Sequence, residues 1–173
     1  IRLKSLNMKI EKLEIATADI GKQLHFYRDL LGLEIRDQEE RSFEIAMGSS
    51  ILKFLQENNF TPYHIAIHIP DKQESLALIW LKSRVSILKN NLDEIVDFSE
   101  WDAKSIYFYD EDKNIMEFIS RGDLNKPFSE VFSEKSLLGI AEIGLATNNI
   151  EEKFNFLHQQ CELEIFDGNF EKF

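Results

Sequence analysis

The sequence predicts an α+β protein made of two βαβββ modules followed by part of a third. Three observations lead to this fold class. Short segments alternate between apolar and polar residues, as half-buried strands do. Segments with apolar residues at helical spacing lie between them. The same order then occurs again further along the chain, and internal repetition is stronger evidence than any single motif.

The first module is predicted over residues 8–57. Ile10–Thr17 alternates, which favours a strand. Asp19 stands at the N-cap position of a helix that ends at Gly32, because glycine tolerates a left-handed backbone. Three short strands are expected after the helix, over 33–36, 42–47 and 51–55, with a hairpin turn at 48–50 between the last two.

The second module is predicted over residues 63–121 and follows the same plan. Tyr63–Ile69 alternates as a strand, Pro70-Asp71 ends it, and Ser75–Leu81 has helical spacing. Residues 83–91 fit either a helical extension or an irregular loop. Strands near 95–98, 105–109 and 115–120 complete the module.

A polar linker is predicted over residues 122–137, and a partial third βαβ module over 138–173. The segment that begins at Glu142 aligns with the segment that begins at Lys12, and Ala146-Thr147, Ile150, Phe156, Leu163-Glu164-Ile165 and Asp167 repeat their counterparts. An incomplete sheet leaves strand edges unpaired. Either the third module is truncated here, or this piece extends the main sheet or a partner's sheet.

Composition excludes several classes of protein. Fourteen phenylalanines in 173 residues supply ample material for a core, and the net charge of −11 argues against nucleic-acid binding. No apolar run approaches the ~20 residues that span a bilayer, and no signal peptide is evident. With one cysteine the default location is the cytoplasm, and Cys161 is expected to be a small core residue.

Two motifs resemble the vicinal-oxygen-chelate superfamily, which contains glyoxalases, bleomycin-resistance proteins and extradiol dioxygenases. The first is FYRDLLGLEI at the end of the first helix. The second is the hairpin in which Phe108, Asp110, Asp112, Asn114 and Glu117 match the pattern F-x-D-P-D-G-N-x-x-E. The resemblance implies that paired modules form a curved mixed-sheet cup with helices outside. It also implies modules that pair within one chain or across two, so a homodimer stays open.

In metal-dependent members, the resemblance implies a ligand on the first and last strand of each module. The corresponding positions here are Lys12, Lys53, His64 and Glu117. Lysine is a poor ligand because its ammonium group has no lone pair. Like charges ~4 Å apart repel by roughly 4 kcal/mol at an effective dielectric of ~20, and a divalent ion doubles this. We therefore expect no metal cofactor, with Glu117 as the counter-ion of the lysines. The alternative is a divalent Fe, Mn, Ni or Zn ion on His64 and Glu117.

Other candidate residues have less specific chemical roles. His68 shares a face with His64 but lies roughly 13 Å along the strand, too far to bind the same ion, so it is expected to line the cavity or form hydrogen bonds. Tyr107 is a candidate pocket residue. Glu142 occupies the first-strand ligand position of the third copy and is expected to be an ordinary exposed carboxylate.

Two functions follow from these residues. The preferred one is a metal-free protein that binds a small organic ligand. For an anionic ligand, Lys12 or Lys53 is the expected cation, and His64 is the expected hydrogen-bond partner or proton acceptor. The other is a metal-dependent lyase, isomerase or ring-cleaving dioxygenase. A purely structural role is a third reading. Whether the protein is an enzyme stays open, because this fold carries many chemistries and also non-enzymes.

Overall fold

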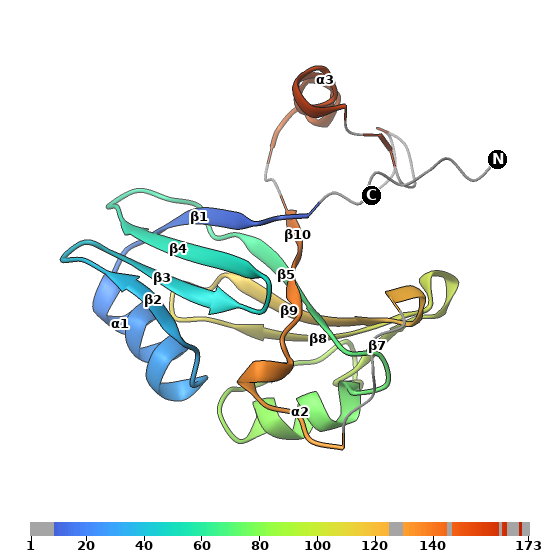
Figure 1. Ribbon diagram of the computed structural model, residues 1–173. Helices are drawn as coiled ribbons and strands as arrows, with labels where there is room; N and C mark the ends of the chain where they lie inside the picture. Colours follow the sequence, from blue (N-terminus) through green and yellow to red (C-terminus); the bar gives the residue numbers. More distant parts are fainter. Residues whose placement is uncertain (1–8, 125–129, 145–146, 163, 166–169, 171–173) are drawn as a thin grey trace.

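The computed structural model describes residues 9–124, 130–144, 147–162, 164–165 and 170, and confirms an α+β protein of βαβββ modules (Figure 1). Its strands form a four-stranded sheet in the order β1-β4-β3-β2 and a six-stranded sheet with the path β10-β5-β9-β8-β6, in which β7 also pairs with β8. The two sheets pack against each other around one large apolar core. No helix in these described ranges is long and apolar enough to cross a membrane.

The first module forms the four-stranded sheet. Its strands are β1 (Lys12–Thr17), β2 (Ile35–Gln38), β3 (Ser42–Met47) and β4 (Ser50–Gln56). One continuous helix consists of α1 (Ile20–Leu24) and a π-helical turn, η1 (His25–Leu30). Asp19 caps this helix by accepting a hydrogen bond from the Lys22 amide, and Gly32 follows it with φ +75°, as the sequence predicts.

The second module supplies most of the six-stranded sheet. Its elements are β5 (His64–Ile69), α2 (Glu74–Lys82), β6 (Ile87–Leu88), β7 (Val96–Phe98), the short helix η2 (Ser99–Trp101), β8 (Ala103–Tyr109) and β9 (Ile115–Arg121). The segment 83–91, which fitted either a helical extension or a loop, contains the short strand β6.

The third module contributes one strand to the second sheet. After the short helices η3 (Gly122–Leu124) and η4 (Glu134–Ser136), β10 (Gly139–Gly144) pairs antiparallel with β5, and α3 (Ile150–Cys161) follows. Figure 1 shows β10 beside β5, with α3 set apart from both sheets. The predicted repeats at 145–146, 163 and 167 lie outside the described residues.

Cys161 is exposed, so the expectation of a core cysteine is wrong. The reason is that α3 has no buried residue among those described. Phe156 on the same helix is also exposed.

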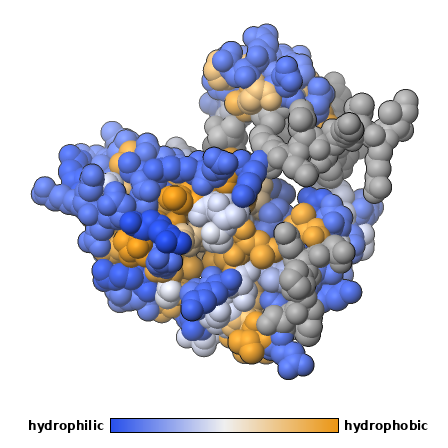
Figure 2. Space-filling model, in the orientation of Figure 1, coloured by the Kyte–Doolittle hydropathy of each residue, from blue (hydrophilic) through white to orange (hydrophobic). Residues whose placement is uncertain are grey.

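In the orientation of Figure 2, hydrophilic side chains dominate the visible surface, and hydrophobic patches show between them.

Buried aromatic side chains join the two modules. Tyr27 packs against Phe54 in the first module, and its hydroxyl donates to Asp110 in the β8–β9 hairpin at 2.9 Å. Gln23 donates to Asp110 and to Asp112 at 3.0 and 2.8 Å. The aspartates of the family hairpin motif therefore fasten the second module to the first helix. Burial raises the pKa of Asp110, and these hydrogen bonds oppose the shift.

Candidate functional site

His64 and Glu117 form the centre of the candidate site. Nε2 of His64 lies 2.8 Å from Oε2 of Glu117, in neighbouring strands β5 and β9. Glu117 is 5% exposed, while about half of the His64 side chain faces solvent. Since a carboxylate can only accept hydrogen bonds, Nε2 carries the proton and Nδ1 is left for another partner. Within the described ranges nothing bonds to Nδ1.

The second oxygen of Glu117 is held from β8. Ser105 Oγ donates to Oε1 at 2.5 Å, and the Tyr107 hydroxyl donates to the same atom at 3.1 Å. Burial and the negative charge of Glu117 raise the pKa of Tyr107, so its hydroxyl stays protonated and remains a donor. The sequence analysis named Tyr107 but missed Ser105. The alternation of β8 could have indicated it, because Ser105 and Tyr107 share a face.

The hydrogen bond that His64 donates to Glu117 is the largest cause of a raised His64 pKa, and burial of the ring opposes it. The carboxylates of Glu117 and Glu142 raise that pKa further through their charges. The pKa of Glu142 is itself raised, first by partial burial of its carboxyl group and then by Glu117. Glu142 is exposed, as expected from the sequence, yet it is electrostatically coupled to both members of the pair.

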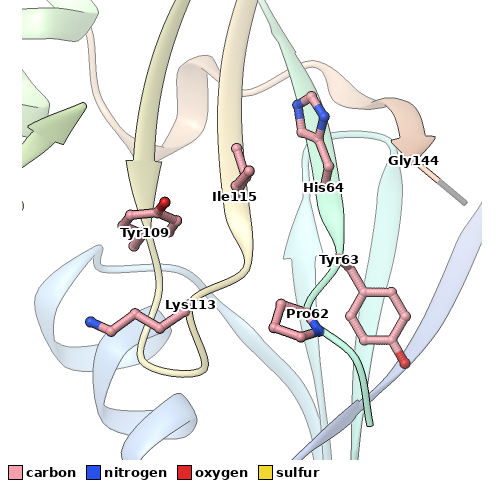
Figure 3. Close-up of a pocket in the computed structure, with 7 residues that line it drawn as sticks. All are labelled: Pro62, Tyr63, His64, Tyr109, Lys113, Ile115 and Gly144. Carbon is pink, nitrogen blue, oxygen red and sulfur yellow. The ribbon is translucent and has the colours of Figure 1, made fainter. Parts of the chain in front are cut away.

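A cavity of about 520 Å³ opens beside His64 (Figure 3). Its lining comes from the segment that enters β5, from the β8–β9 hairpin and from the end of β10. The residues are Pro62, Tyr63, His64, Tyr109, Lys113, Ile115 and Gly144. Figure 3 shows Tyr109 and Lys113 on one side of His64 and Gly144 on the other. The Lys113 ammonium lies 5.9 Å from the centre of the Tyr109 ring.

The register of the strands bears out the superposition of the two modules. Lys12 pairs with Ile51 as His64 pairs with Ile115, and Glu14 pairs with Lys53 as Ala66 pairs with Glu117. Lys12 and Lys53 are thus the structural equivalents of His64 and Glu117.

The lysines nevertheless do not meet His64 and Glu117. Lys12 pairs with Glu44 at 2.6 Å, and Lys53 lies 3.4 Å from Glu14 and 3.9 Å from Glu44. The expectation that Glu117 neutralises the lysines is therefore wrong. The physical reason is the sheet order: the strand beside β5 is β10, not β1, so the edge next to His64 is filled by the third module.

The remaining candidate, His68, lies on β5 with its backbone next to β10. Its carbonyl accepts a hydrogen bond from the Leu138 amide. It does not line the cavity beside His64.

The described residues do not complete a metal centre. His64 and Glu117 are suitable ligands, and Glu142 is near them. Even so, no group of three or more His, Cys, Asp or Glu side chains in the described ranges is arranged to hold a metal ion. No chemical step is therefore assigned to a metal.

The chain is similar to known proteins in sequence and in fold. The chain is 33% identical over 116 residues to the metallothiol transferase FosB of Staphylococcus epidermidis, covering 62% of this chain and 80% of that protein. It is similar in fold to a protein from Bacillus subtilis subsp. subtilis str. 168 proposed to be a dioxygenase, with a TM-score of 0.66 and 14% identity, over 94% of this chain and 57% of that one.

A second solved structure, a glyoxalase/bleomycin resistance protein/dioxygenase from Alicyclobacillus acidocaldarius, has a TM-score of 0.54 and 17% identity, over 69% of this chain and 96% of that one. At such identities the similarity to solved structures supports the fold alone. The family profile, however, matches residues 9–161, which include every strand and helix described above. The chain therefore belongs to the Glyoxalase/Bleomycin resistance protein/Dioxygenase superfamily.

Proposed function

We propose that this protein binds a small organic acid in the cavity beside His64, without requiring a metal ion. The observation that carries the proposal is the pairing of His64 with a buried carboxylate at the wall of an open cavity. Glu117 orients the imidazole, so that Nδ1 can accept a proton or a hydrogen bond from a ligand. The lysine that lines this cavity is Lys113. Lys12 and Lys53, the lysines expected there from the sequence, lie on β1 and β4 of the other sheet.

The lining suits a ligand with an apolar body and an anionic group. Pro62, Tyr109 and Ile115 present apolar surface, and Lys113 has no ion-pair partner in the described part of the chain. A ligand carboxylate could pair with this ammonium. Since an exposed pair is worth at most about 1 kcal/mol, Lys113 should contribute no more than about fivefold to affinity.

The test is titration of the protein with 4-methylbenzoate, followed by NMR of the His64 ring. The matched neutral probe is 4-methylbenzamide. We expect 4-methylbenzoate to shift the His64 signals and to bind more tightly than the amide. His64→Gln should abolish most of the binding, and Lys113→Asn should weaken it by up to about fivefold.

The control for Lys113→Asn is Lys72→Asn. Both lysines have a left-handed backbone, with φ of 65° and 62°, which asparagine tolerates, and Lys72 does not line the cavity. Equal effects of the two substitutions would contradict a role for Lys113. If neither probe changed the NMR signals of the His64 ring, the proposal would be overturned.

A metal-dependent enzyme is the second candidate, and one observation favours it. Glu142 adds a second carboxylate beside His64 and Glu117, while the two lysines that would repel a cation lie on the other sheet. The chain is also 33% identical over 116 residues to a relative named as a metallothiol transferase. Elemental analysis after incubation with Fe(II), Mn(II), Ni(II) and Zn(II) decides between the candidates: stoichiometric metal that Glu117→Ala abolishes would favour the enzyme.

A further inference from the structure

Glu142 carries a carboxylate that is not paired with any other side chain of the described structure. It is exposed, and no described side chain forms an ion pair or a hydrogen bond with it. The two cations whose charges oppose the raised pKa of Glu142 already contact other carboxylates: Arg121 contacts Asp123 twice at 3.0 Å, and His64 contacts Glu117 at 2.8 Å. A carboxylate that is left without a partner beside a buried one raises the electrostatic energy of the site. The question is which group could lower it.

Strand register places this carboxylate over the candidate site. Glu142 of β10 lies opposite Ala66 of β5, Ala66 lies opposite Glu117 of β9, and Glu117 lies opposite Tyr107 of β8. Directly opposed residues project from the same face of a sheet. The four side chains therefore form one row across four strands, on the face that carries the His64–Glu117 contact.

Ala66 is the residue that makes room between the two carboxylates. Neighbouring strands are about 4.8 Å apart, so Glu142 and Glu117 originate about 10 Å from each other, with only a methyl group between them. Ala66 itself is buried in a small cluster with Ala103 and Ile119. The charges of Glu117 and Glu142 each act on His64, which stands two residues before Ala66 on the same face of β5.

The opposite side of the cavity carries a cation. Lys113 precedes Ile115, and Ile115, His64 and Gly144 lie opposite one another in β9, β5 and β10. Gly144 lines the cavity two residues after Glu142, on the same face of β10. Figure 3 shows Lys113 and Gly144 on opposite sides of His64. Lys113, whose ammonium has no ion-pair partner in the described ranges, therefore lies at one side of the cavity, and Glu142 stands two residues before Gly144, which lines the other side.

We propose that Glu142 selects a ligand with two opposite charges, binding its ammonium group while Lys113 binds its carboxylate. The inference rests on the proposed function and adds the second charge. Lys113 and Glu142 originate two strand spacings apart across the sheet, roughly 10 Å, and Lys113 lies a further four residues from the row that contains Glu117 and Glu142. An ω-amino acid with an apolar body therefore suits the site better than an α-amino acid, whose charges share one carbon atom. Glu142 is then a specificity residue supplied by the third module.

Four probes with one ring test this assignment. They are 4-(aminomethyl)benzoate, with both charges; 4-methylbenzoate, with the anion only; 4-methylbenzylammonium, with the cation only; and neutral 4-methylbenzamide. Affinity is measured by NMR titration of the metal-free protein. We expect the doubly charged probe to bind most tightly, and Glu142→Gln to weaken it and 4-methylbenzylammonium by about fivefold while leaving 4-methylbenzoate unchanged.

Two further variants make the result specific. Lys113→Asn should show the reverse pattern, weakening the two probes that carry a carboxylate and sparing 4-methylbenzylammonium. Glu152→Gln, at an exposed carboxylate on α3, removes the same charge away from the cavity and should change no probe.

The outcomes separate this inference from the proposed function. Binding of 4-methylbenzoate through His64 with no effect of Glu142→Gln on any probe would overturn the inference and leave the proposed function in place. Loss of all binding in the wild-type protein would overturn both. Stoichiometric binding of Mn(II) that Glu142→Gln abolishes, with no response to 4-methylbenzylammonium, would assign Glu142 to a metal instead.

Discussion

Ala66 lies opposite Glu117 on one side and opposite Glu142 on the other, so that the last strand of the second module and the first strand of the third flank a single small residue. This relationship explains why the site belongs to modules two and three. β10 occupies the edge of β5 that the first module would need in order to reach His64. The chemistry of the site is consequently that of one imidazole and two carboxylates, without the lysines of β1 and β4.

Replacing Glu117 by glutamine should lower the pKa of His64 toward its ordinary value. The hydrogen bond that the Glu117 carboxylate accepts from His64 is the largest cause of the raised pKa, and an uncharged amide removes both that charge-assisted bond and the attraction for the imidazolium. NMR titration of the His64 ring measures the change. Asp97→Asn, at an exposed carboxylate in the same sheet, is the control. A His64 pKa that is unchanged by Glu117→Gln would show that the contact is not formed in solution.

His64 should also make stability depend on pH in a definite direction. Because the pKa of His64 is raised above its ordinary value of 6.5, the folded protein binds the proton more tightly than the unfolded chain. This contribution is fully present below the unfolded pKa and is lost as pH rises through the folded pKa. Urea unfolding of wild type and His64→Gln across this interval should therefore give a stability difference that decreases with rising pH. A difference that grows with pH would contradict the assignment.

Ser105→Ala should destabilise the protein by about 1.5–3 kcal/mol, because it removes a hydrogen bond to a buried carboxylate. Tyr107→Phe removes the other donor to the same oxygen. The two effects should not be additive, since the remaining donor can move closer to Glu117 once the first is lost. Chemical unfolding of both single variants and the double variant measures the coupling. The exposed Ser99→Ala is the control and should change stability by less than about 0.5 kcal/mol.

The local elements of the fold could be predicted from the sequence because their signals are local. Alternation located β3 at Ser42–Met47, and the Asp19 cap and Gly32 bounded the first helix. The correspondence of Lys12 with His64 and of Lys53 with Glu117 also followed from repetition alone, and the strand registers agree with it. These features depend on residues within one module.

What the sequence did not reveal is which modules lie side by side. The pairing of β10 with β5 depends on contacts between segments far apart in the chain, and the alternation of each strand is the same whichever neighbour it has. For this reason the lysines were assigned to the wrong carboxylates, and Glu142 was treated as an ordinary surface residue. Lys113 was missed because a hairpin residue carries no periodic signal.

Gly48→Ala should be one of the most damaging single substitutions outside the site. Gly48 has φ +58°, and a Cβ atom there would meet the backbone of residues 137–139, just where the chain enters β10. The substitution therefore combines left-handed strain with a backbone clash, for an expected loss of about 3 kcal/mol or more. Gly32→Ala is the matched control, because Gly32 has φ +75° but nothing within 4 Å of an added Cβ, so that strain alone should cost about 1–2 kcal/mol. Chemical unfolding gives both values.

Because the clash would displace β10, Gly48→Ala should also change the pKa of His64 through Glu142, whereas Gly32→Ala should not. Equal losses of stability in the two variants, with identical His64 titrations, would mean that the turn at Gly48 does not support β10.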